Sequence, residues 1–571
     1  MVLLILLLGQ SFTAYFDSSL AFIGLTRADL TFRSDYVKSD DYRFDIIDSL
    51  LKEPLVSSQF VERLHDDFCE HSPADAFVSL TDIYKFELTG QKTDIFSALE
   101  QAKELLEEAF PADAPEIMGV LEELIRFSPE PTGSIAEERA HERAYDSLTS
   151  FLRRHARQID CENIFLAGYT ILSALEGYSV GDLNLPLSRT HVEGVSGDIL
   201  YYGEYDFGEF VIGDLGANIY ERDFAIIIDI GGNDTYRVPG HHGFVRVIID
   251  ESGDDSYLGG EYNVACGRFG VSIVLDRQGD DLYRARSFSI GAGLFGVGVL
   301  IDESGDDRYH GDTFTQGAGC FGIGILSDLS GNDHYEGALY AQGFASTYGI
   351  GILGDANGND RYIIRPVYLD EIRYLDHYLS MSQGFAIGFR PDLPAGIGLL
   401  FEGGGNDYYI SDIFGQGAAY WYGIGAIVER GGNDNYIGYQ YVQGSGTHIA
   451  LGLLIDDRGD DNYVAKGVAQ GCGHDLSLGF LYDRSGDDTY ASFDLSQGAG
   501  NANGIGLLID EVGDDTYAVK RSTNTQGYGD FRREFGSIGV LLDIRGDDSY
   551  TTGGDAEFWE KGTYGIGADW E

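Results

Sequence analysis

A repeat of 26 or 27 residues fills the last two-thirds of the chain and limits its fold more than any other feature. Each copy ends on a tyrosine, and eight of the eleven steps between these tyrosines are 26 or 27 residues, the others being 21, 47 and 33. Because a fixed step of this length marks a repeat architecture, we expect each copy to stack on the next. The tyrosines are Tyr236, Tyr257, Tyr283, Tyr309, Tyr335, Tyr362, Tyr409, Tyr436, Tyr463, Tyr490, Tyr517 and Tyr550.

The repeated unit has the form QGxGxxxGxGxLxDxxG(D/N)DxY, in which short runs of β-forming residues are separated by glycine and aspartate turns. This composition fits one coil of a parallel β-solenoid. Helical repeats would be destabilised by so many glycines, and a β-propeller blade needs about 40 residues. The sequence therefore predicts a mainly β protein: a parallel β-solenoid (β-helix) of about 12 coils with 26-27-residue repeats, preceded by an α-helical domain.

The composition divides the chain into three parts. Only eight of the 79 glycines precede residue 190, and the segment before it has apolar residues at helical spacing. Residues 1–14, "MVLLILLLGQSFTA", suit the apolar core of a secretory signal peptide, with a buried first element as the alternative. We expect a signal peptide over 1–14, a helical domain over 15–190, and a solenoid over 195–571 with insertions at 363–394 and 519–534.

Charge and cysteine content exclude several classes of protein. A formal net charge of -55, from 93 acidic and 38 basic residues, makes nucleic acid a poor partner because phosphates would be repelled. The five cysteines are scattered and form no CxxC motif, so neither a disulfide framework nor a zinc site is indicated. No later stretch has the ~20 apolar residues of a spanning helix, so we expect no transmembrane span in the mature chain.

Carboxylates recur at fixed positions of the unit, as Asp302, Asp306 and Asp307 do in "LIDESGDDRY". Coils stacked at about 4.8 Å would place them in columns, and each like-charge contact would cost roughly 3 to 4 kcal/mol at an effective dielectric of about 20. Bound cations, protonation or spreading into solvent could relieve this repulsion. Hard oxygen ligands on glycine-rich turns favour calcium over zinc, copper or magnesium. The candidate ligands that follow each apolar run are Asp229, Asp250, Asp276, Asp302, Asp328, Asp355, Asp456, Asp483, Asp510 and Asp543.

The segments "GGNDTY" (231–236), "GGNDYY" (404–409) and "GGNDNY" (431–436) resemble part of the hemolysin-type (RTX) calcium repeat, GGxGxDxUx. RTX repeats recur every nine residues, whereas this chain has one such turn per coil. The resemblance implies that the aspartate of each turn faces calcium and that the tyrosine enters the core. These ligands would be Asp234, Asp255, Asp281, Asp307, Asp333, Asp360, Asp407, Asp434, Asp461, Asp488, Asp515 and Asp548. The alternative is a turn in which the side chains bond only to nearby backbone amides.

The predicted function is that of an exported, calcium-stabilised solenoid, secreted, periplasmic or at the cell surface. It would serve as a structural, adhesive or ligand-binding surface protein whose partner is a glycan or another cell-surface protein. The alternative is a carbohydrate-active enzyme, a polysaccharide lyase or glycoside hydrolase, with its site at the inserted loops. Their candidate residues, which could instead neutralise local acids, are Arg365, Asp370, Glu371, Arg373, His377, Arg390, Lys520, Arg521, Arg532 and Arg533.

Overall fold

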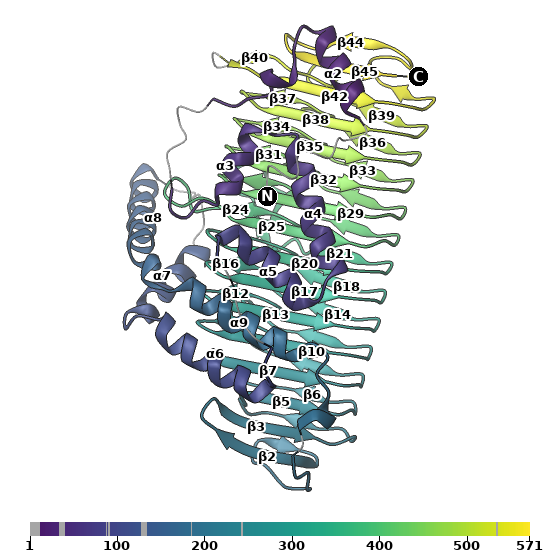
Figure 1. Cartoon of the computed structure of the whole chain (residues 1–571). Helices are drawn as coiled ribbons and strands as arrows, with labels where there is room; N and C mark the ends of the chain where they lie inside the picture. Colours follow the sequence, from purple (N-terminus) through teal and green to yellow (C-terminus); the bar gives the residue numbers. More distant parts are fainter. Residues whose placement is uncertain are drawn as a thin grey trace.

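The chain folds into a long parallel β-solenoid with α-helices laid along one of its faces (Figure 1). The structure, a computed structural model, describes residues 12–33, 40–86, 88, 92–126, 134–183, 185–240, 244–532 and 535–570. The predicted fold class is confirmed: about 12 coils of some 27 residues follow a helical region.

Eight α-helices lie in the described residues before the solenoid, and several begin at side-chain caps. The side chains of Ser72, Asp94 and Asp160 accept backbone N–H groups of the first turn, and Ser134 forms a capping box with Glu137. The helices are α2 (Thr13–Phe22), α3 (Asp45–Lys52), α4 (Val56–Glu70), α5 (Pro73–Tyr84), α6 (Ile95–Ala109), α7 (Ala114–Arg126), α8 (Ile135–His155) and α9 (Cys161–Leu175).

The longest sheet has 16 strands, most of which carry the apolar run of one repeat. We call it the long sheet. Its strands, in spatial order, are β2 (Ile199–Tyr205), β3 (Gly208–Gly213), β5 (Ile226–Asp229), β7 (Val245–Asp250), β10 (Val271–Asp276), β13 (Val297–Asp302), β17 (Ile323–Asp328), β20 (Ile350–Asp355), β25 (Ile397–Glu402), β29 (Ile424–Glu429), β32 (Leu451–Asp456), β35 (Leu478–Asp483), β38 (Ile505–Asp510), β42 (Ile538–Asp543), β45 (Gly565–Asp569) and β44 (Phe558–Glu560).

The second sheet has 14 short strands that follow the acidic turns and mostly carry the repeated tyrosine. We call it the tyrosine sheet. Its strands are β1 (Val195–Ser196), β4 (Ile219–Tyr220), β6 (Thr235–Tyr236), β8 (Ser256–Leu258), β11 (Leu282–Arg284), β14 (Arg308–His310), β18 (His334–Gly337), β21 (Arg361–Ile364), β26 (Tyr408–Ile410), β30 (Asn435–Ile437), β33 (Asn462–Val464), β36 (Thr489–Ser492), β39 (Thr516–Val519) and β43 (Ser549–Tyr550).

The return segments that close each coil form smaller sheets. Their strands are β9 (Gly267–Arg268), β12 (Gly293–Leu294), β16 (Gly319–Cys320), β24 (Ala386–Ile387), β28 (Ala419–Tyr420), β31 (Gly446–Thr447), β34 (Gly473–His474), β37 (Gly500–Asn501), β15 (Thr313–Thr315), β19 (Leu339–Ala341), β22 (Tyr368–Leu369), β23 (Tyr378–Ser382), β27 (Ile413–Gly415), β40 (Phe531–Arg532) and β41 (Phe535–Gly536).

Register in both main sheets follows the sequence repeat. Asp276 pairs with Asp302 between β10 and β13, and Tyr283 pairs with Tyr309 between β11 and β14, each one repeat apart. Equivalent residues therefore stack directly along the axis. The tyrosine rings stack face to face within the core, for example 4.8 Å apart between Tyr283 and Tyr309, so the predicted core role of the tyrosines is confirmed.

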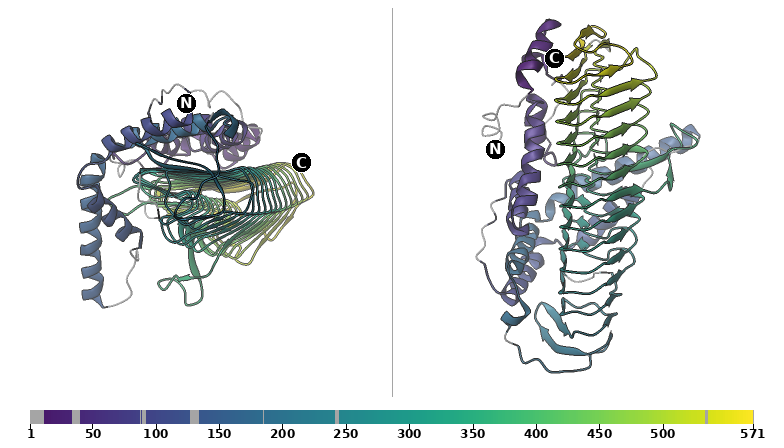
Figure 2. Two further views of the ribbon diagram at one scale, coloured as in Figure 1. Left: turned by 90° about the horizontal axis from the view of Figure 1, so that it is seen from below. Right: turned by 90° about the vertical axis from the view of Figure 1, so that its right-hand side faces the viewer.

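The long sheet is buried on both faces, which explains its continuous apolar runs. Along β10, Val271, Ile273 and Leu275 belong to the core shared with the helices, whereas Val274 packs with the tyrosines inside the coil. The helices contact this outer face at points far apart along the rod. Phe96 meets Phe210 near one end, and Phe12 meets Phe480 near the other. Figure 2 shows the helices covering this face along most of the rod, while α8 projects beyond it.

Most of the predicted signal peptide, residues 1–11, lies outside the described residues. The remainder belongs to the folded body, because Phe12 is fully buried and α2 begins at Thr13. In the described part of the chain, no helix combines the length and the hydropathy needed to cross a bilayer.

The first predicted insertion forms the antiparallel pair β22–β23 and a loop that continues to residue 394. Most of its charged residues are neutralised by acids or bases nearby, as Arg365 is by Asp312 and Glu336. Arg373 pairs with Asp370, and an ion pair or hydrogen bond also joins His377 to Asp412. In the second insertion Arg521 pairs with Asp494, while residues 533–534 lie outside the described residues.

A glycine at the second position of nine strands of the long sheet, from β13 to β42, allows the return segment to approach closely. At Gly425 an added Cβ would lie 2.0 Å from the carbonyl oxygen of Ala418. We predict that Gly425→Ala destabilises the chain by about 1 to 3 kcal/mol, because backbone must move to relieve the overlap. Thermal unfolding checks this, with Gly260→Ala as the control because nothing lies within 4 Å of a Cβ there. Equal melting temperatures for both variants would contradict it.

Candidate metal centre

Two columns of carboxylates run through the interior of the solenoid, one on each side of the acidic turn. The strand-end column holds the last residue of 13 of the 16 long-sheet strands: Asp229, Asp250, Asp276, Asp302, Asp328, Asp355, Glu402, Glu429, Asp456, Asp483, Asp510, Asp543 and Asp569. The turn column holds the aspartate two residues before each tyrosine: Asp234, Asp255, Asp281, Asp307, Asp333, Asp360, Asp407, Asp434, Asp461, Asp488, Asp515 and Asp548. Apart from the part-exposed Asp548, their residues are at most 2% exposed.

Strand-end carboxylates are held mainly by hydrogen bonds from tyrosine hydroxyls and turn amides. Asp456 accepts from the hydroxyl of Tyr436 on the preceding coil (2.8 Å) and from the backbone N–H of Arg458 (3.2 Å). The tyrosine contact continues from Tyr220, which donates to Asp229, as far as Tyr517, which donates to Asp543. From Tyr220 to Tyr517, the hydroxyl of each stacked tyrosine therefore ties one coil to the acid of the next.

Turn-column carboxylates have one satisfied oxygen and one that lacks a partner. Oδ1 of Asp461 accepts from the backbone N–H of Asp434, and Oδ1 of Asp488 accepts from that of Asp461, both at 2.6 Å. Oδ2 of all twelve turn-column residues is buried and has no hydrogen-bond partner. Because burying a polar oxygen without a partner is unfavourable, a proton or a cation must compensate this row of oxygens.

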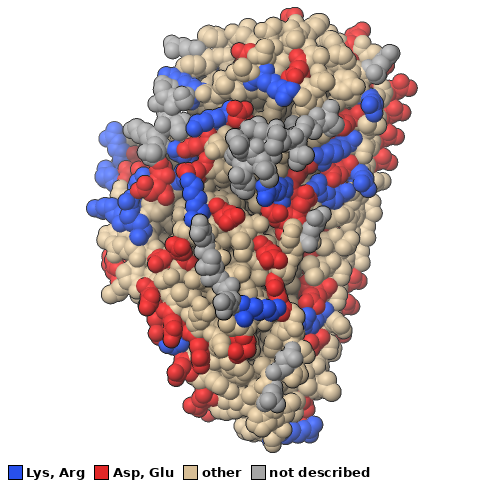
Figure 3. All heavy atoms as spheres, in the orientation of Figure 1, with Lys and Arg blue, Asp and Glu red and all other residues tan. Residues whose placement is uncertain are grey.

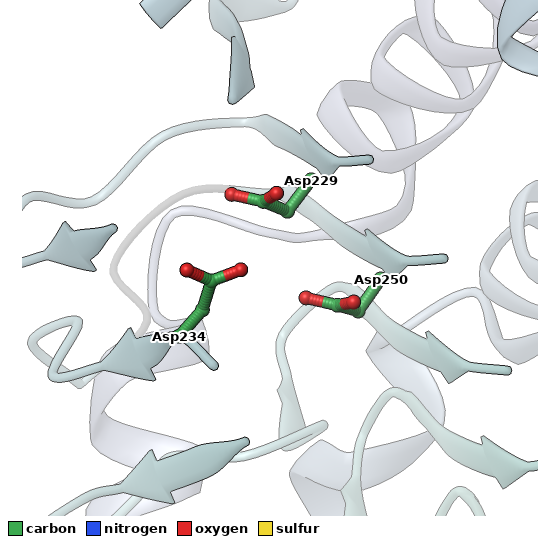
Figure 4. A group of neighbouring side chains, drawn as sticks. All are labelled: Asp229, Asp234 and Asp250. Carbon is green, nitrogen blue, oxygen red and sulfur yellow. The ribbon is translucent and has the colours of Figure 1, made fainter. Parts of the chain in front are cut away.

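The two columns bring carboxylate oxygens together in groups of three. Oxygen atoms of Asp229, Asp234 and Asp250 lie within 4.8 Å of one another, and so do those of Asp281, Asp302 and Asp307, a group with two turn-column acids and one strand-end acid. Figure 4 shows Asp229 and Asp250 on adjacent strands of the long sheet, with Asp234 facing them from the turn column. Each group thus combines residues from two coils and from both sides of the turn, and offers only oxygen ligands.

Burial and mutual repulsion favour the neutral forms of these acids. Removal from water, together with the charges of Asp483 and Asp434, raises the pKa of Asp461 to about 9. Desolvation raises the pKa of Asp281 to about 7, although the backbone N–H of Asp255 opposes the shift. Without bound metal, carboxyl groups of the columns would therefore retain protons at neutral pH that the same groups would release in the unfolded chain.

The middle acid of each turn lies outside these columns and is exposed to solvent. Asp306 accepts from the side-chain amide of Asn332 (3.0 Å) and from its backbone N–H (2.9 Å), and these two donors lower the pKa of Asp306. Asp487 accepts similarly from Asp514, and asparagines replace the acids midway along the row. Figure 3 shows acidic side chains following this edge of the molecule, at the right of the view. Repulsion in this row is relieved by water, one of the three outcomes expected from the sequence.

All 22 aspartates predicted as ligands lie in the two columns, but the sequence prediction missed three members. Glu402, Glu429 and Asp569 occupy strand-end positions, and Glu429 accepts from Tyr409 (2.6 Å) as the aspartates do. Their position directly after the apolar run was the available signal. The prediction also missed the neutral first member of the turn column, Asn218, whose amide donates to Asp229 (3.1 Å).

The repeated glutamines of the Gln-Gly motif bond to the backbone of neighbouring strands. Gln443 donates to the backbone carbonyls of Tyr436 (2.9 Å) and Val464 (3.1 Å), on two successive coils. Its Oε1 is buried without a hydrogen-bond partner, as it is in six other glutamines. Positive φ values at these glutamines turn the side chains toward backbone carbonyls rather than toward each other.

The fold and the columns together define an acidic β-solenoid repeat protein. Comparison with known proteins adds no family to this description: no protein-family model, no curated protein and no solved structure matches the chain.

The tyrosine hydroxyls are predicted to stabilise the buried acids. Tyr409→Phe removes the donor to Glu429 and leaves a buried carboxyl short of a partner, so we expect a loss of about 1 to 3 kcal/mol in thermal unfolding. Tyr408→Phe is the matched control, because Tyr408 is the adjacent tyrosine in the sequence and is itself 44% exposed. A loss of the same size in both variants would show that the contact with Glu429 is unimportant.

The raised pKa values predict an unusual pH dependence once metal has been removed. The acids are protonated in the fold up to about pH 7 to 9 but only up to about pH 4 when unfolded. Their contribution to stability is therefore full below about pH 4 and is lost as pH rises through 7 to 9. We expect a higher melting temperature in chelator at pH 5 than at pH 8.5.

This pH measurement requires about 1 M NaCl, which screens exposed carboxylates but not buried ones. A melting temperature that stays constant or rises between pH 5 and pH 8.5 would contradict the assignment of the raised pKa values to the columns.

Proposed function

We propose that the chain is an exported structural protein whose solenoid is held together by calcium ions in the acid columns and presents a surface for binding. The observation that carries this proposal is the row of buried turn-column oxygens without hydrogen-bond partners. Turn-column acids such as Asp234 lie beside strand-end carboxylates of the same and the neighbouring coil, here Asp229 and Asp250.

The chemistry of the ligands supports calcium over other metals. Each group presents aspartate or glutamate oxygens only, and these hard ligands bind calcium or magnesium rather than zinc or copper. Magnesium keeps several waters and is usually held by one or two carboxylates, whereas calcium accepts several mono- or bidentate carboxylates in a flexible arrangement. Three buried carboxylates without an accompanying base therefore suit calcium best.

A shared proton is the competing arrangement. A proton on Oδ2 of a turn-column acid could be donated to the strand-end carboxylate beside it, and the raised pKa values are compatible with this. One proton would still leave a negative charge on each coil inside the solenoid. A divalent cation removes more of the repulsion along the column, and this difference favours the metal.

Export is part of the proposal because calcium is abundant outside the cell. Calcium sites of extracellular modules work at dissociation constants of about 10⁻⁴ to 10⁻³ M, so modest affinity per coil would suffice outside the cell. The apolar start of the sequence and the likeness of its turns to RTX repeats support the same location.

The enzyme alternative stays a prediction without a specific observation in its favour. Most charged groups of the first insertion are joined in pairs, such as Arg373 with Asp370 and His377 with Asp412. Paired charges of this kind are expected of a loop that neutralises its own acids.

Calcium binding is tested by thermal unfolding of the whole chain with calcium and with excess chelator at pH 8, together with metal analysis of the purified protein. Calcium at 100 times its dissociation constant stabilises by about 2.7 kcal/mol per site, so we expect a large rise in melting temperature. Asp461→Asn should reduce this rise, because the amide removes one ligand charge from the column.

The adjacent variant Asp460→Asn is the matched control, since Asp460 is exposed and its equivalent in the preceding coil is already Asn433. The shared-proton arrangement predicts the opposite result. Calcium would leave the melting temperature unchanged, and Asp461→Asn would be as stable as the parent because an amide resembles a protonated acid.

A further inference from the structure

A groove with an aromatic and cationic lining crosses several coils at the corner where the return segments enter the long sheet. It has a volume of about 550 Å³ and is lined in part by Trp421, His448, Asp475 and Asn503, from four successive coils. Two consecutive residues with positive φ make each corner, as at Trp421 (59°) and Tyr422 (54°), of which Trp421 is part-exposed and Tyr422 is buried. The groove lies away from the acid columns.

Arg390 of the first insertion stands at one end of this groove. Its guanidinium lies over the Trp421 ring, with Cζ 5.1 Å from the ring centroid, and Nη1 donates to the hydroxyl of Tyr420 (2.9 Å). Arg390 is exposed and has no carboxylate partner among the described residues. It differs in this from Arg365 and Arg373 of the same insertion, which are both paired with acids.

The far end of the groove repeats the combination of arginine and aromatic ring. The guanidinium of Arg33 lies 4.3 Å from the centroid of Phe535, and its backbone N–H donates to Oδ1 of Asn503 (3.3 Å). Between the two ends, His448 contacts Asp475 through Nδ1 and Oδ2 at 2.5 Å. Two arginines and one acid line the groove of a chain whose net charge is -55, so its lining is locally cationic.

The polar groups in the groove fit hydroxyl groups as well as a negative charge. Asp475 can accept from a hydroxyl as well as from His448, while the amide of Asn503 already bonds to the backbone of Arg33 and Gly536. The Asp475 carboxylate and the acidic body of the protein would repel a phosphate-rich chain, which makes a nucleic acid or polyphosphate the poorer fit. Aromatic faces pack against apolar ring faces, and guanidinium matches carboxylate.

We infer that this groove binds an acidic oligosaccharide, with a uronic acid carboxylate on Arg390 and its sugar ring against Trp421. The inference extends the binding role proposed above by naming the ligand class, and it does not require calcium in the acid columns. Neighbouring corner residues lie about 4.8 Å apart along the rod, so a chain of sugars could follow the groove toward Arg33.

The inference is tested by titrating the whole chain with trigalacturonic acid and following tryptophan fluorescence. The chain has three tryptophans, so Trp421→Phe identifies the responding ring. We expect saturable quenching by the acid. Its methyl ester, which keeps the rings but lacks the charge, should bind at least about tenfold more weakly than the acid. Arg390→Ala should weaken binding of the acid by about tenfold or more.

Arg361→Ala is the matched control, because Arg361 is an exposed arginine on β21 of the tyrosine sheet, outside the groove. It should bind the acid as the parent does. Equal binding of acid and ester, an unaffected Arg390→Ala variant, or no binding of the acid would each overturn the inference. Calcium-dependent melting is measured on the same samples, so that failure of the groove and failure of the calcium proposal give different results.

Discussion

Repulsion between stacked buried carboxylates is the constraint on which the rest of the structure depends. Strands in register place equivalent acids about 4.8 Å apart, and each contact between charged neighbours would cost roughly 3 to 4 kcal/mol at an effective dielectric of about 20. The strand-end and turn columns cannot spread into water, since nearly all their residues are at most 2% exposed. A fold that keeps them must supply donors, protons or cations in every coil.

The surrounding residues supply donors for most of these oxygens. Tyrosine hydroxyls and turn amides donate to most strand-end acids, and backbone amides of the preceding coil satisfy one oxygen of each turn acid. The Oδ2 row of the turn column is the deficit that recurs in all twelve turns, whereas among the strand-end acids only oxygens of Asp510, Asp543 and Asp569 lack a partner. The same tyrosines stack along the core, so one residue of each coil provides both apolar packing and the hydrogen bond that orients an acid.

The helices contribute in a different way. The long sheet exposes a second apolar face, exemplified by Ile273, which a bare solenoid would leave in water. Helices placed along the rod cover it through contacts such as that of Phe12 with Phe480. Ion pairs at the edge, such as that between Arg484 and Glu62, join the helices to the turns. The helical region is thus a covering layer for the sheet.

The sequence by itself determined the repeat, its β-solenoid form and the positions of 22 of the column acids, because a constant step with constant residue types leaves little choice of register. The predicted ligands Asp510 and Asp515 are buried, whereas the intervening Asp514, which was not among them, is exposed. Only the tertiary structure decided that Glu402 and Glu429 join the columns and that the helices cover the long sheet. It also brought Arg390 over Trp421. These outcomes depend on the direction of side chains at turns and on contacts between distant segments, which residue spacing does not contain.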